Sequence, residues 1–403
     1  MAPAGVGITL INNVNFMLYA PLLPGAAAGT LDPRHIVVPL REHLRRTSLR
    51  LGWVTGGDPA RSTLQVEMIS GAREELHYDH LVVALGSIAR VVAIPGLVEH
   101  AIGFKTIADA IALRNRIVRH FEMAESLDDA EARLQYLSFV FVGGGYAGLE
   151  GIAELADFAR DALRRYPRCR EVGTRFTLVD IAERIMPEIQ PELAEFTIAL
   201  LQRRGIEFRL GTAVTEVRDD SVTLATGETL PCRTVCWTAG VRASPVASRL
   251  GLPLDGGRIV CDELMRVEGF RNVWALGDIA AVPDPARPGS PCPPTAQHAI
   301  RQGTLMARNL AAVMDGKQPK PFKFKTLGSF ADLGRHRAVA NVMGVRVKGF
   351  LAWAICRFYH LAWMPGLDRK SRLIADWSVE LLFPRDIAEM GQLGHPAALD
   401  TPE

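Results

Sequence analysis

The order of hydrophobic and polar residues divides most of the chain into short strands and amphipathic helices. Apolar runs rich in β-forming residues predict strands at 6–11, 50–55, 63–69, 81–85, 206–210, 214–217 and 221–225. Apolar residues at helical spacing predict helices over 103–122, 191–204, 295–313, 349–365 and 373–383. Residues 128–137 are predicted to be a linker. Strands that alternate with helices over 403 residues indicate an α/β protein of two or more domains.

The strongest local motif lies where the apolar run at 139–142 meets a helical pattern. The sequence there reads Gly143-x-Gly145-x-x-Gly148. In a strand–turn–helix context the first glycine permits a tight turn, the second lets a pyrophosphate approach the backbone, and the third lets the helix pack close to the strand. The pyrophosphate then lies at the positive N-terminal end of the helix. The motif predicts a dinucleotide site; the alternative is a glycine turn in an unrelated α/β unit.

The next predicted strand, at 175–180, ends in Asp180. A carboxylate at this position accepts hydrogen bonds from both ribose hydroxyls and repels a 2′-phosphate, so it favours NADH over NADPH. The spacing from Gly145 is longer than the usual ~20 residues, and we expect an insertion around residues 166–169. Arg184 could instead attract a phosphate, which keeps NADPH as the alternative.

Three other apolar runs that predict strands also end in a glycine. Residues 81–86 end in Gly86, residues 235–240 end in Gly240, and residues 272–278 end in Gly277-Asp278. A glycine at a strand end indicates a ligand or a turn. Repetition of the pattern downstream of two nucleotide-like strands suggests a duplicated architecture, whereas simple surface turns with a solvated Asp278 are the alternative.

Composition limits the class of protein. The chain is 48% hydrophobic and 22% charged, which is ordinary for a globular protein. No window offers the ~20 uninterrupted apolar residues of a membrane span, and no secretory leader opens the chain. The six cysteines form no CxxC pair, so we expect reduced thiols in a cytosolic setting, and no metal site is predicted.

Charge is uneven although the net charge is only +2. Residues 320–372 contain eleven Lys and Arg against two acids, Asp332 and Asp368, which points to an anionic surface partner. The helix at 349–365 is predicted to present one apolar face, made of Phe350, Trp353, Ala354, Arg357, Phe358, Leu361 and Ala362. Together with helix 373–383 and flanking Lys348, Arg357, Arg369, Lys370 and Arg372, it suits an interfacial position on anionic lipid. Helices buried against the core or a dimer mate are the alternative. We exclude nucleic acid, because the basic residues lie among large apolar ones and no binding motif is visible.

Seven pieces of the chain occur in the order found in one protein family: residues 19–23, 34–41, 82–87, 143–150, 237–240, 276–278 and 296–297. Together they make the chain resemble the type II NADH dehydrogenases. These are single-subunit, non-pumping NADH:quinone oxidoreductases within the FAD-dependent pyridine nucleotide-disulfide oxidoreductase superfamily. The likeness covers nearly the whole chain, and the combination is more specific than any one motif.

The resemblance implies an α/β fold with two Rossmann-like three-layer dinucleotide-binding domains and a C-terminal helical membrane-docking region. It divides the chain into a first part of the FAD-binding domain (1–106), an NADH-binding domain (107–242), a second FAD-binding part (243–320) and the docking region (321–403). Glu150 resembles the family's acid beside the nicotinamide and flavin, and Gln297 its glutamine near the flavin and quinone; these are the two predicted catalytic residues. The implied FAD contacts are Asn12, Arg41, Gly86, Gly277, Asp278, Ala296 and Gln297. The implied NADH contacts are Gly143, Gly145, Tyr146, Ala147, Gly148, Glu150, Asp180, Ala239 and Gly240.

Three positions depart from the family pattern. The family begins with a strand and its own glycine loop for FAD, and that unit is missing before residues 8–11. The strand expected to end in an acid for the FAD ribose ends in Asn12, and Arg301 stands where the family often has a second glutamine. We expect either a mis-assigned start codon or a truncated, poorly flavinated protein.

The implied chemistry needs a carrier between a two-electron hydride donor and a quinone. Flavin is such a carrier, and the chain offers no suitable dithiol. A semi-buried Glu150 would have a raised pKa and could relay protons, although an acid near a helix N-terminus also simply stabilises the helix dipole. We therefore predict a peripheral enzyme on the cytoplasmic face of the cell membrane that uses FAD and NADH and reduces quinone. A homodimer is one form that we expect. The alternatives are a soluble FAD-dependent NAD(P)H reductase of a protein or small acceptor, and a flavin-less nucleotide-binding relic.

Overall fold

The computed structural model describes residues 5–389, except 325 and 327, and the chain divides into two units. Unit 1 comprises Met1–Met17, Pro39–Ile88 and Val241–Leu327, and unit 2 comprises Leu18–Val38, Ala89–Gly240 and Gly328–Glu403. The chain passes from one unit to the other within β2 (Phe16–Leu18), β3 (Val37–Pro39) and β8 (Ser87–Ala89), and just before β17 (Val241–Ala243). The four domain boundaries given above stay a prediction, and residues 390–403 of the last domain lie outside the described part.

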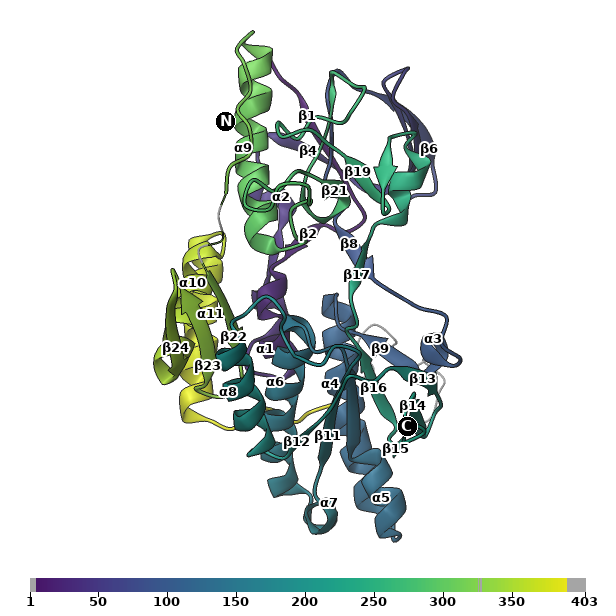
Figure 1. Ribbon diagram of the computed structural model, residues 1–403, viewed down its shortest axis with the longest axis vertical. Helices are drawn as coiled ribbons and strands as arrows, with labels where there is room; N and C mark the ends of the chain where they lie inside the picture. The colour runs from purple at the N-terminus through teal and green to yellow at the C-terminus, as the bar shows by residue number, and fades with distance from the viewer. Residues whose placement is uncertain (1–4, 325, 327, 390–403) are drawn as a thin grey trace, which may run out of the picture. The chain divides into compact units, whose positions relative to one another are not determined.

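Unit 2 is built on a sheet of five parallel strands in the order β12-β11-β10-β16-β9 (Figure 1). Their bounds are Ile206–Leu210, Arg175–Asp180, Ser138–Val142, Thr234–Trp237 and Ala101–Gly103. All of β10 is buried. A strand that is covered on both faces needs a nearly continuous apolar sequence, which explains the run at 139–142. Val142 lies opposite Val179 and Trp237, so β11, β10 and β16 end at one edge of the sheet.

The side chains of β10 alternate between two cores. Phe139 and Phe141 pack into the helical core that includes α4 (Ile107–Ser126), α6 (Tyr146–Ala162) and α8 (Pro191–Gln202). Val140 and Val142 pack into a second core with an antiparallel sheet of β13 (Val214–Val217), β14 (Ser221–Leu224) and β15 (Thr229–Pro231). Helices, parallel sheet and antiparallel sheet make three layers, as predicted for a dinucleotide-binding domain.

Unit 1 contains a four-stranded sheet in the order β1-β4-β5-β6, with bounds Ile8–Asn12, Thr47–Asp58, Thr63–Met68 and Arg73–His77. Unit 1 also contains a parallel pair, β7 (Leu81–Val83) with β20 (Val273–Ala275), and a sheet of β18 (Leu254–Asp255), β19 (Arg258–Val260) and β21 (Ala280–Ala281). The short α2 (Leu40–His43) and the long α9 (Ala296–Met314) also belong to this unit. Its core surrounds Trp274, which is fully buried. Leu64, Met306 and Phe322 are buried in the same core.

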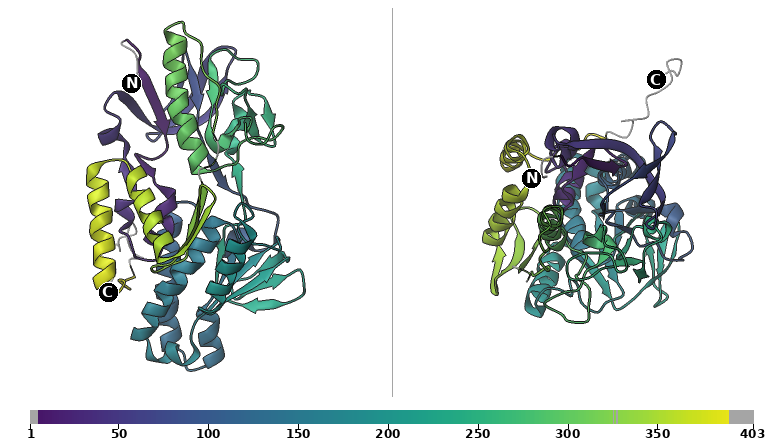
Figure 2. Two further views of the ribbon diagram at one scale, coloured as in Figure 1. Left: turned by 60° about the vertical axis from the view of Figure 1, so that its left-hand side comes forward. Right: turned by 90° about the horizontal axis from the view of Figure 1, so that it is seen from above.

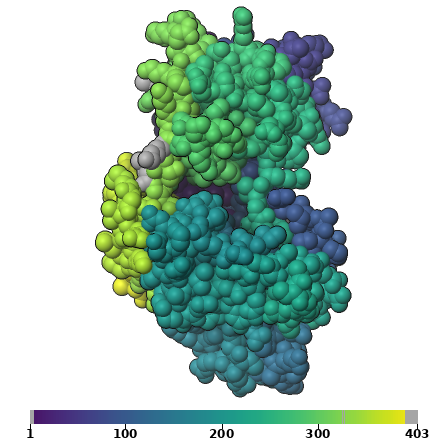
Figure 3. Space-filling view, viewed as in Figure 1, coloured from purple at the N-terminus to yellow at the C-terminus, as the bar shows by residue number. Residues whose placement is uncertain are grey.

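The C-terminal part of unit 2 is an antiparallel sheet followed by two helices (Figure 2). The sheet consists of β22 (Gly328–Asp332), β23 (Ala338–Val342) and β24 (Val345–Gly349), and the helices are α10 (Phe350–Trp363) and α11 (Leu367–Leu382). Lys348 Nζ lies 4.4 Å from the ring centroid of Phe196 in α8, so β24 contacts that helix (Figure 3). After α11 the chain returns to α4, where Arg114 donates hydrogen bonds to the carbonyls of Asp386 (2.7 Å) and Ala388 (2.8 Å).

The prediction of a linker at residues 128–137 is wrong. Ala130–Tyr136 form the helix α5, and the Asp129 carboxylate caps it by accepting hydrogen bonds from the N–H groups of Glu131 (3.3 Å) and Ala132 (3.1 Å). The buried Arg133 donates to the carbonyls of Arg168 (3.0 Å) and Leu127 (3.1 Å). A short helix held by a cap and by a buried arginine needs no apolar stripe, which is why periodicity missed it.

The predicted lipid-facing stripe of helix 349–365 also needs correction. Trp353 and Arg357 are only 8% and 9% exposed, whereas Phe350 and Phe358 are 64% and 74% exposed. The helix is apolar nearly all round, so helical spacing alone could not separate the face packed on unit 2 from the face that is free. Among the described residues, no helix is both long enough and apolar enough to span a bilayer.

Candidate functional site

The glycine turn of unit 2 begins where β10 ends. The N–H of Gly143 donates to the carbonyl of Val179 (2.8 Å), and Gly143 has a φ of +117°, a conformation that side chains rarely adopt. A Cβ at this position would lie 2.7 Å from Thr238 Oγ1. Thr238 in turn donates to the carbonyls of Val142 (2.9 Å) and Gly143 (3.1 Å), so it locks the turn from the end of β16. The first glycine is therefore required by both conformation and space.

The other two glycines of the turn have opposite surroundings. A Cβ on Gly148 would lie 2.0 Å from the carbonyl oxygen of Gly143, so the close packing of α6 on the strand end depends on the missing side chain. A Cβ on Gly145 would meet no described atom within 4 Å, and no described side chain caps α6 at this residue. The N–H groups of Tyr146 and Ala147 follow in the first turn of α6, where a helix has no carbonyl of its own to accept from them. An uncapped helix N-terminus with open approach is suited to a phosphate.

Asp180 lies beside the same turn, at the end of β11. One carboxylate oxygen accepts a hydrogen bond from the N–H of Gly144, and the other accepts one from the N–H of Ala182 (2.7 Å). The extra sequence before Asp180 is accounted for by α7 (Pro167–Val172). Arg184 donates to the carbonyl of Pro187 (2.8 Å), so its guanidinium is engaged within its own loop. The arrangement holds the carboxylate next to the turn, where a ribose would follow a pyrophosphate.

Glu150, in the second turn of α6, is the remaining predicted residue near this turn with an ionisable side chain. Its Oε1 accepts a hydrogen bond from the main-chain N–H of Asp332 (3.0 Å). Burial raises the pKa of Glu150 to about 8, the charge of Glu154 adds to the rise, and the bond from Asp332 opposes it. The carboxyl therefore holds a proton at neutral pH. Unit 2 thus gathers the predicted residues Gly143, Gly145, Gly148, Glu150 and Asp180, with Ala239 and Gly240 following Thr238 at the end of β16.

Unit 1 carries a second candidate site at the ends of β7 and β20. The Asp278 carboxylate accepts a hydrogen bond from Ser87 Oγ (2.6 Å), and Gly277 N–H donates to Gln302 Oε1 (2.7 Å). Gly86 and Gly277 have φ values of +63° and +74°. A Cβ on Gly86 would meet no described atom within 4 Å, and one on Gly277 would meet only Ala299 Cβ at 3.6 Å. An acceptor carboxylate beside two open glycines fits the hydroxyl-rich ribitol of a flavin cofactor.

The other predicted residues of unit 1 divide into two groups. Ala296 and Gln297 open α9, which packs on the Gly277 turn. Asn12, at the end of β1, donates to the carbonyl of Val14 (2.8 Å), and Arg41, in α2, donates to the carbonyl of Leu49 (3.4 Å). Both of these bonds stay within the local segment, so the assignment of Asn12 and Arg41 to a cofactor stays a prediction.

Sequence reasoning missed the residues that hold these sites in place. Thr238, Ser87 and Gln302 each bond to a predicted residue or its turn, and Asp332 bonds to Glu150. Ser87 and Thr238 are adjacent to the glycine endings of their strands, which is the only signal that could have found them. Asp332 lies 182 residues from Glu150, and nothing local marks it.

Comparison with known proteins gives consistent matches. Residues 1–303 match the family described as pyridine nucleotide-disulphide oxidoreductase. The chain is 32% identical over 398 residues to the type II NADH:quinone oxidoreductase Ndh of Mycobacterium tuberculosis, covering 95% of this chain and 84% of that protein. It is 30% identical to a probable NADH dehydrogenase of Dictyostelium discoideum, covering 94% of this chain and 85% of that protein.

Solved structures share the fold. NDH2 from Plasmodium falciparum, in complex with NADH, superposes with a TM-score of 0.89 at 18% identity and covers 95% of this chain and 94% of that chain. A water-forming NADH oxidase from Lactobacillus brevis, bound to NADH, has a TM-score of 0.66 at 21% identity and covers 83% of this chain and 69% of that chain.

Proposed function

The chain belongs to the pyridine nucleotide-disulphide oxidoreductase family, and within it to the type II NADH:quinone oxidoreductases, and from this we propose how it works: a hydride passes from NADH through FAD, and two electrons reach a membrane quinone without proton pumping. The enzyme uses FAD and NADH. The observation that carries the proposal is the glycine turn of unit 2, open at Gly145 and followed on the same helix by the protonated Glu150.

NADH is proposed to bind through backbone more than through side chains. The N–H groups after Gly145 take the pyrophosphate, with the helix dipole of α6 favouring its charge. Asp180 takes the ribose hydroxyls, and Ala239 and Gly240 border the nicotinamide end. A full negative charge at Asp180 disfavours a 2′-phosphate, so the enzyme is proposed to prefer NADH to NADPH.

FAD is proposed to lie against the Asp278 turn of unit 1. When bound, FAD accepts a hydride and passes the electron pair on, which no side chain of this chain can do. Asp278 accepts hydrogen bonds from ribitol hydroxyls, and the absence of side chains at Gly86 and Gly277 leaves the backbone accessible. Gln297 and Ala296, at the start of α9, are proposed to contact the ring end and the quinone head group.

Glu150 is proposed to supply the proton that quinone reduction consumes. The overall reaction is NADH plus a proton plus quinone, giving NAD⁺ and quinol. The Glu150 carboxyl is protonated at neutral pH because burial raises its pKa. An acid with a pKa close to the working pH both holds a proton and releases it readily, which is the requirement for general acid catalysis.

The C-terminal helices are proposed to dock on an anionic membrane surface, from which a quinone would enter. Large apolar side chains of α10 and α11 remain exposed: Phe350, Leu351, Phe358, Leu367, Ile374, Val379, Leu381 and Leu382. Basic Lys370 and Arg372 lie on the same pair of helices, and Arg346 and Lys348 lie on β24. Apolar side chains with a basic surround favour the interface of an anionic bilayer, and the cytoplasmic face is the proposed location.

The test combines activity with membrane binding. The purified full chain, supplied with FAD, should oxidise NADH with a water-soluble quinone, and Glu150→Gln should lower kcat at least about tenfold. Wild-type protein should co-sediment with vesicles containing phosphatidylserine and much less with neutral ones. The triple variant F358S/L367S/L382S should lose this binding, while the control V98S/I69S, which alters exposed apolar residues elsewhere, should keep it. Concentration-dependent dimers that disappear in the triple variant would instead assign the apolar surface to a second copy.

A further inference from the structure

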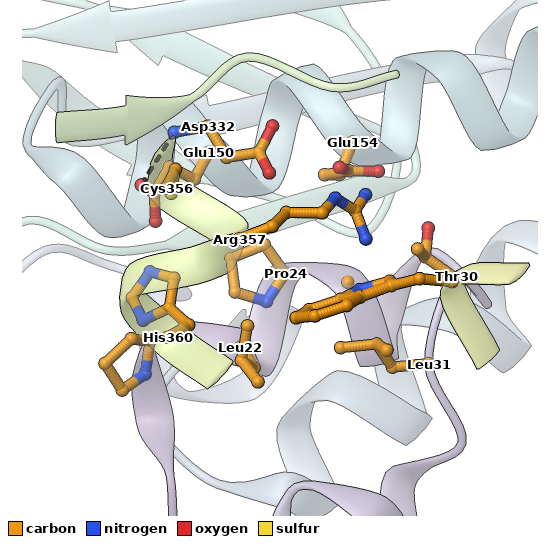
Figure 4. A pocket seen from close by; sticks show the side chains of 13 residues that line it. Leu22, Pro24, Thr30, Leu31, Glu150, Glu154, Asp332, Cys356, Arg357 and His360 are labelled. Atoms are coloured by element: carbon orange, nitrogen blue, oxygen red, sulfur yellow. Dashed lines mark hydrogen bonds between the residues drawn. The ribbon is translucent and has the colours of Figure 1, made fainter. Parts of the chain in front are cut away.

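A small cavity lies inside unit 2, among α1 (Leu23–Ala27), α6, β22, α10 and α11 (Figure 4). Apolar residues of the 21–31 segment form one side, and Glu150, Glu154, Asp332 and Arg357 form another. Its volume of about 30 Å³ is room for about two water molecules and not for a quinone ring. The cavity is therefore suited to moving protons rather than to binding the organic substrate.

The charges around this cavity do not balance. Arg385 Nη2 lies 2.7 Å from Glu154 Oε2, and Arg357 Nη2 lies 3.2 Å from Glu380 Oε2. All four of these side chains are buried. Glu150 and Asp332 are the two further acids, and among the described residues neither lies within 4.0 Å of a cationic nitrogen. Two partly exposed carboxyl groups without a cation of their own ionise less readily than paired ones, so this arrangement favours their protonated forms.

Glu150 is also held next to Asp332 through the main chain of Asp332, and both side chains line the cavity. The main-chain N–H of Asp332 donates to Glu150 Oε1 at 3.0 Å. The pKa of Asp332 is raised well above its ordinary value by burial first and by the charge of Glu154, while Arg357 opposes the rise and Glu150 adds to it. Glu150 in turn has a pKa of about 8. Because the charge of Glu150 disfavours ionisation of Asp332, we expect the two acids to release their protons in separate steps.

The other titratable groups around the pair leave its protons in place. On α10, burial holds the His360 pKa at about 4, so this imidazole is neutral, and it bonds to Tyr19 Oη at 3.2 Å. The pKa of the Cys356 thiol, also on α10, is raised well above its ordinary value by burial. On α6, Asp157 is paired with Arg204 at 2.7 Å. Burial also raises the pKa of Glu154, but the charge of Arg385 at 2.7 Å opposes the rise, so Glu150 and Asp332 are the acids of this cavity without a cation within 4.0 Å among the described residues.

One wall of the cavity carries a polar group that suggests what fills it. Thr30 is only 5% exposed and lines the cavity, and its Oγ1 meets no hydrogen-bonding partner among the described residues. A buried hydroxyl without a protein partner requires water or a ligand to satisfy it. Across the cavity, carboxyl groups would give such a water its further partners.

We propose that Asp332 feeds protons to Glu150 and that the cavity beside Thr30 is the water-filled entrance to this relay. The proposal rests on the proposed function for the redox reaction itself. In each turnover Glu150 gives its proton to the reduced quinone oxygen, the Asp332 O–H passes its proton through water in the cavity that both residues line to the Glu150 carboxylate, and a proton from bulk water returns to Asp332. One proton enters and one is consumed. Asp332 acts through Glu150 and is in that sense a positioning residue.

The first test needs no activity. The infrared C=O band of protonated carboxyl groups is titrated from about pH 5 to pH 10 in the full chain with isotope-labelled aspartate. Wild type should lose two buried bands in two steps, one of them shifted by the label. Asp332→Asn and Glu150→Gln should each leave a single step, and the control Asp129→Asn, which alters the cap of α5, should keep both. An Asp332 that is ionised across the whole range would overturn the proposal.

The second test is the pH dependence of quinone reduction. Asp332→Asn should stay within about twofold of wild type near pH 6, where bulk protons reload Glu150 readily, and should fall at least about tenfold below wild type near pH 9. Asp332→Glu should restore the wild-type profile. Equal loss at every pH would mean a structural role and would overturn the relay. If wild type reduces no quinone, the proposed function fails while the infrared titration still decides whether the pair exists.

Discussion

Helix α6 begins in a site made of backbone and continues into one made of side chains. At its N-terminus, Gly143, Gly145 and Gly148 provide conformation and space, and no described side chain caps the helix. Between about one and three turns later, Glu150, Glu154 and Asp157 bond to residues far away in the sequence: Asp332, Arg385 and Arg204. The first region depends on the absence of side chains, and the second depends on partners that other segments bring to its acidic side chains. The difference teaches that a ligand-binding turn is encoded locally, whereas protonation of a buried acid is encoded by the whole fold.

The largest expected effect comes from breaking the buried ion pair between Arg385 and Glu154. Arg385→Ala should lower the free energy of unfolding by about 3–5 kcal/mol, because it leaves Glu154 buried and unpaired. Replacing both partners, as in R385M/E154L, should recover most of this loss. Urea denaturation of the full chain measures both. The exposed Arg164, which lies 3.7 Å from Asp161, is the control, and Arg164→Ala should change stability by less than about 1 kcal/mol.

A change at the backbone region should alter binding without altering the fold. Gly145→Ala places a methyl group where no described atom lies within 4 Å, so the melting temperature should stay the same. The same methyl group would obstruct the pyrophosphate, and NADH affinity should fall about a hundredfold, or ~2.7 kcal/mol. Fluorescence titration with NADH measures it. Gly303→Ala, also in open space but within α9, is the matched control; unchanged affinity in G145A would contradict the assignment.

Glu150 joins the two regions, and its titration should appear in the pH dependence of stability. Its folded pKa of about 8 lies above the ordinary 4.5, so its contribution to stability is fully present below pH 4.5 and is lost as the pH rises through about 8. In that window wild type should lose up to about 1.4 kcal/mol per pH unit from this group.

Glu150→Gln should remove that part of the slope while keeping an acceptor for the Asp332 N–H. Denaturant unfolding between about pH 5 and 9 measures the difference. The exposed Glu131 supplies the control variant E131Q, which should retain the wild-type slope. Identical slopes in E150Q and wild type would mean that Glu150 is ionised throughout.

The smallest expected effect concerns the choice of nucleotide. Asp180→Asn removes the negative charge beside the ribose and weakens two hydrogen bonds to the turn. NADH affinity should fall about tenfold and the preference over NADPH should narrow, because a charged acceptor contributes about 1.5–3 kcal/mol. Parallel titrations with NADH and NADPH test this. An unchanged ratio of the two affinities would show that Asp180 does not discriminate between them.

The sequence determined the glycine turn, the strand endings at Gly86, Gly240 and Gly277, and the three-layer fold of unit 2, because each depends on backbone conformation or on periods of a few residues. It also placed Glu150 near the start of the helix that follows the glycine turn, where the structure has it in the second turn of α6. Only the tertiary structure decided that Asp332 bonds to Glu150, that Arg357 is buried against Glu380 rather than exposed to lipid, and that residues 130–136 form a helix. The physical reason is distance along the chain: a buried charge takes its partner from whichever segment folds against it, and no local pattern records which segment that is.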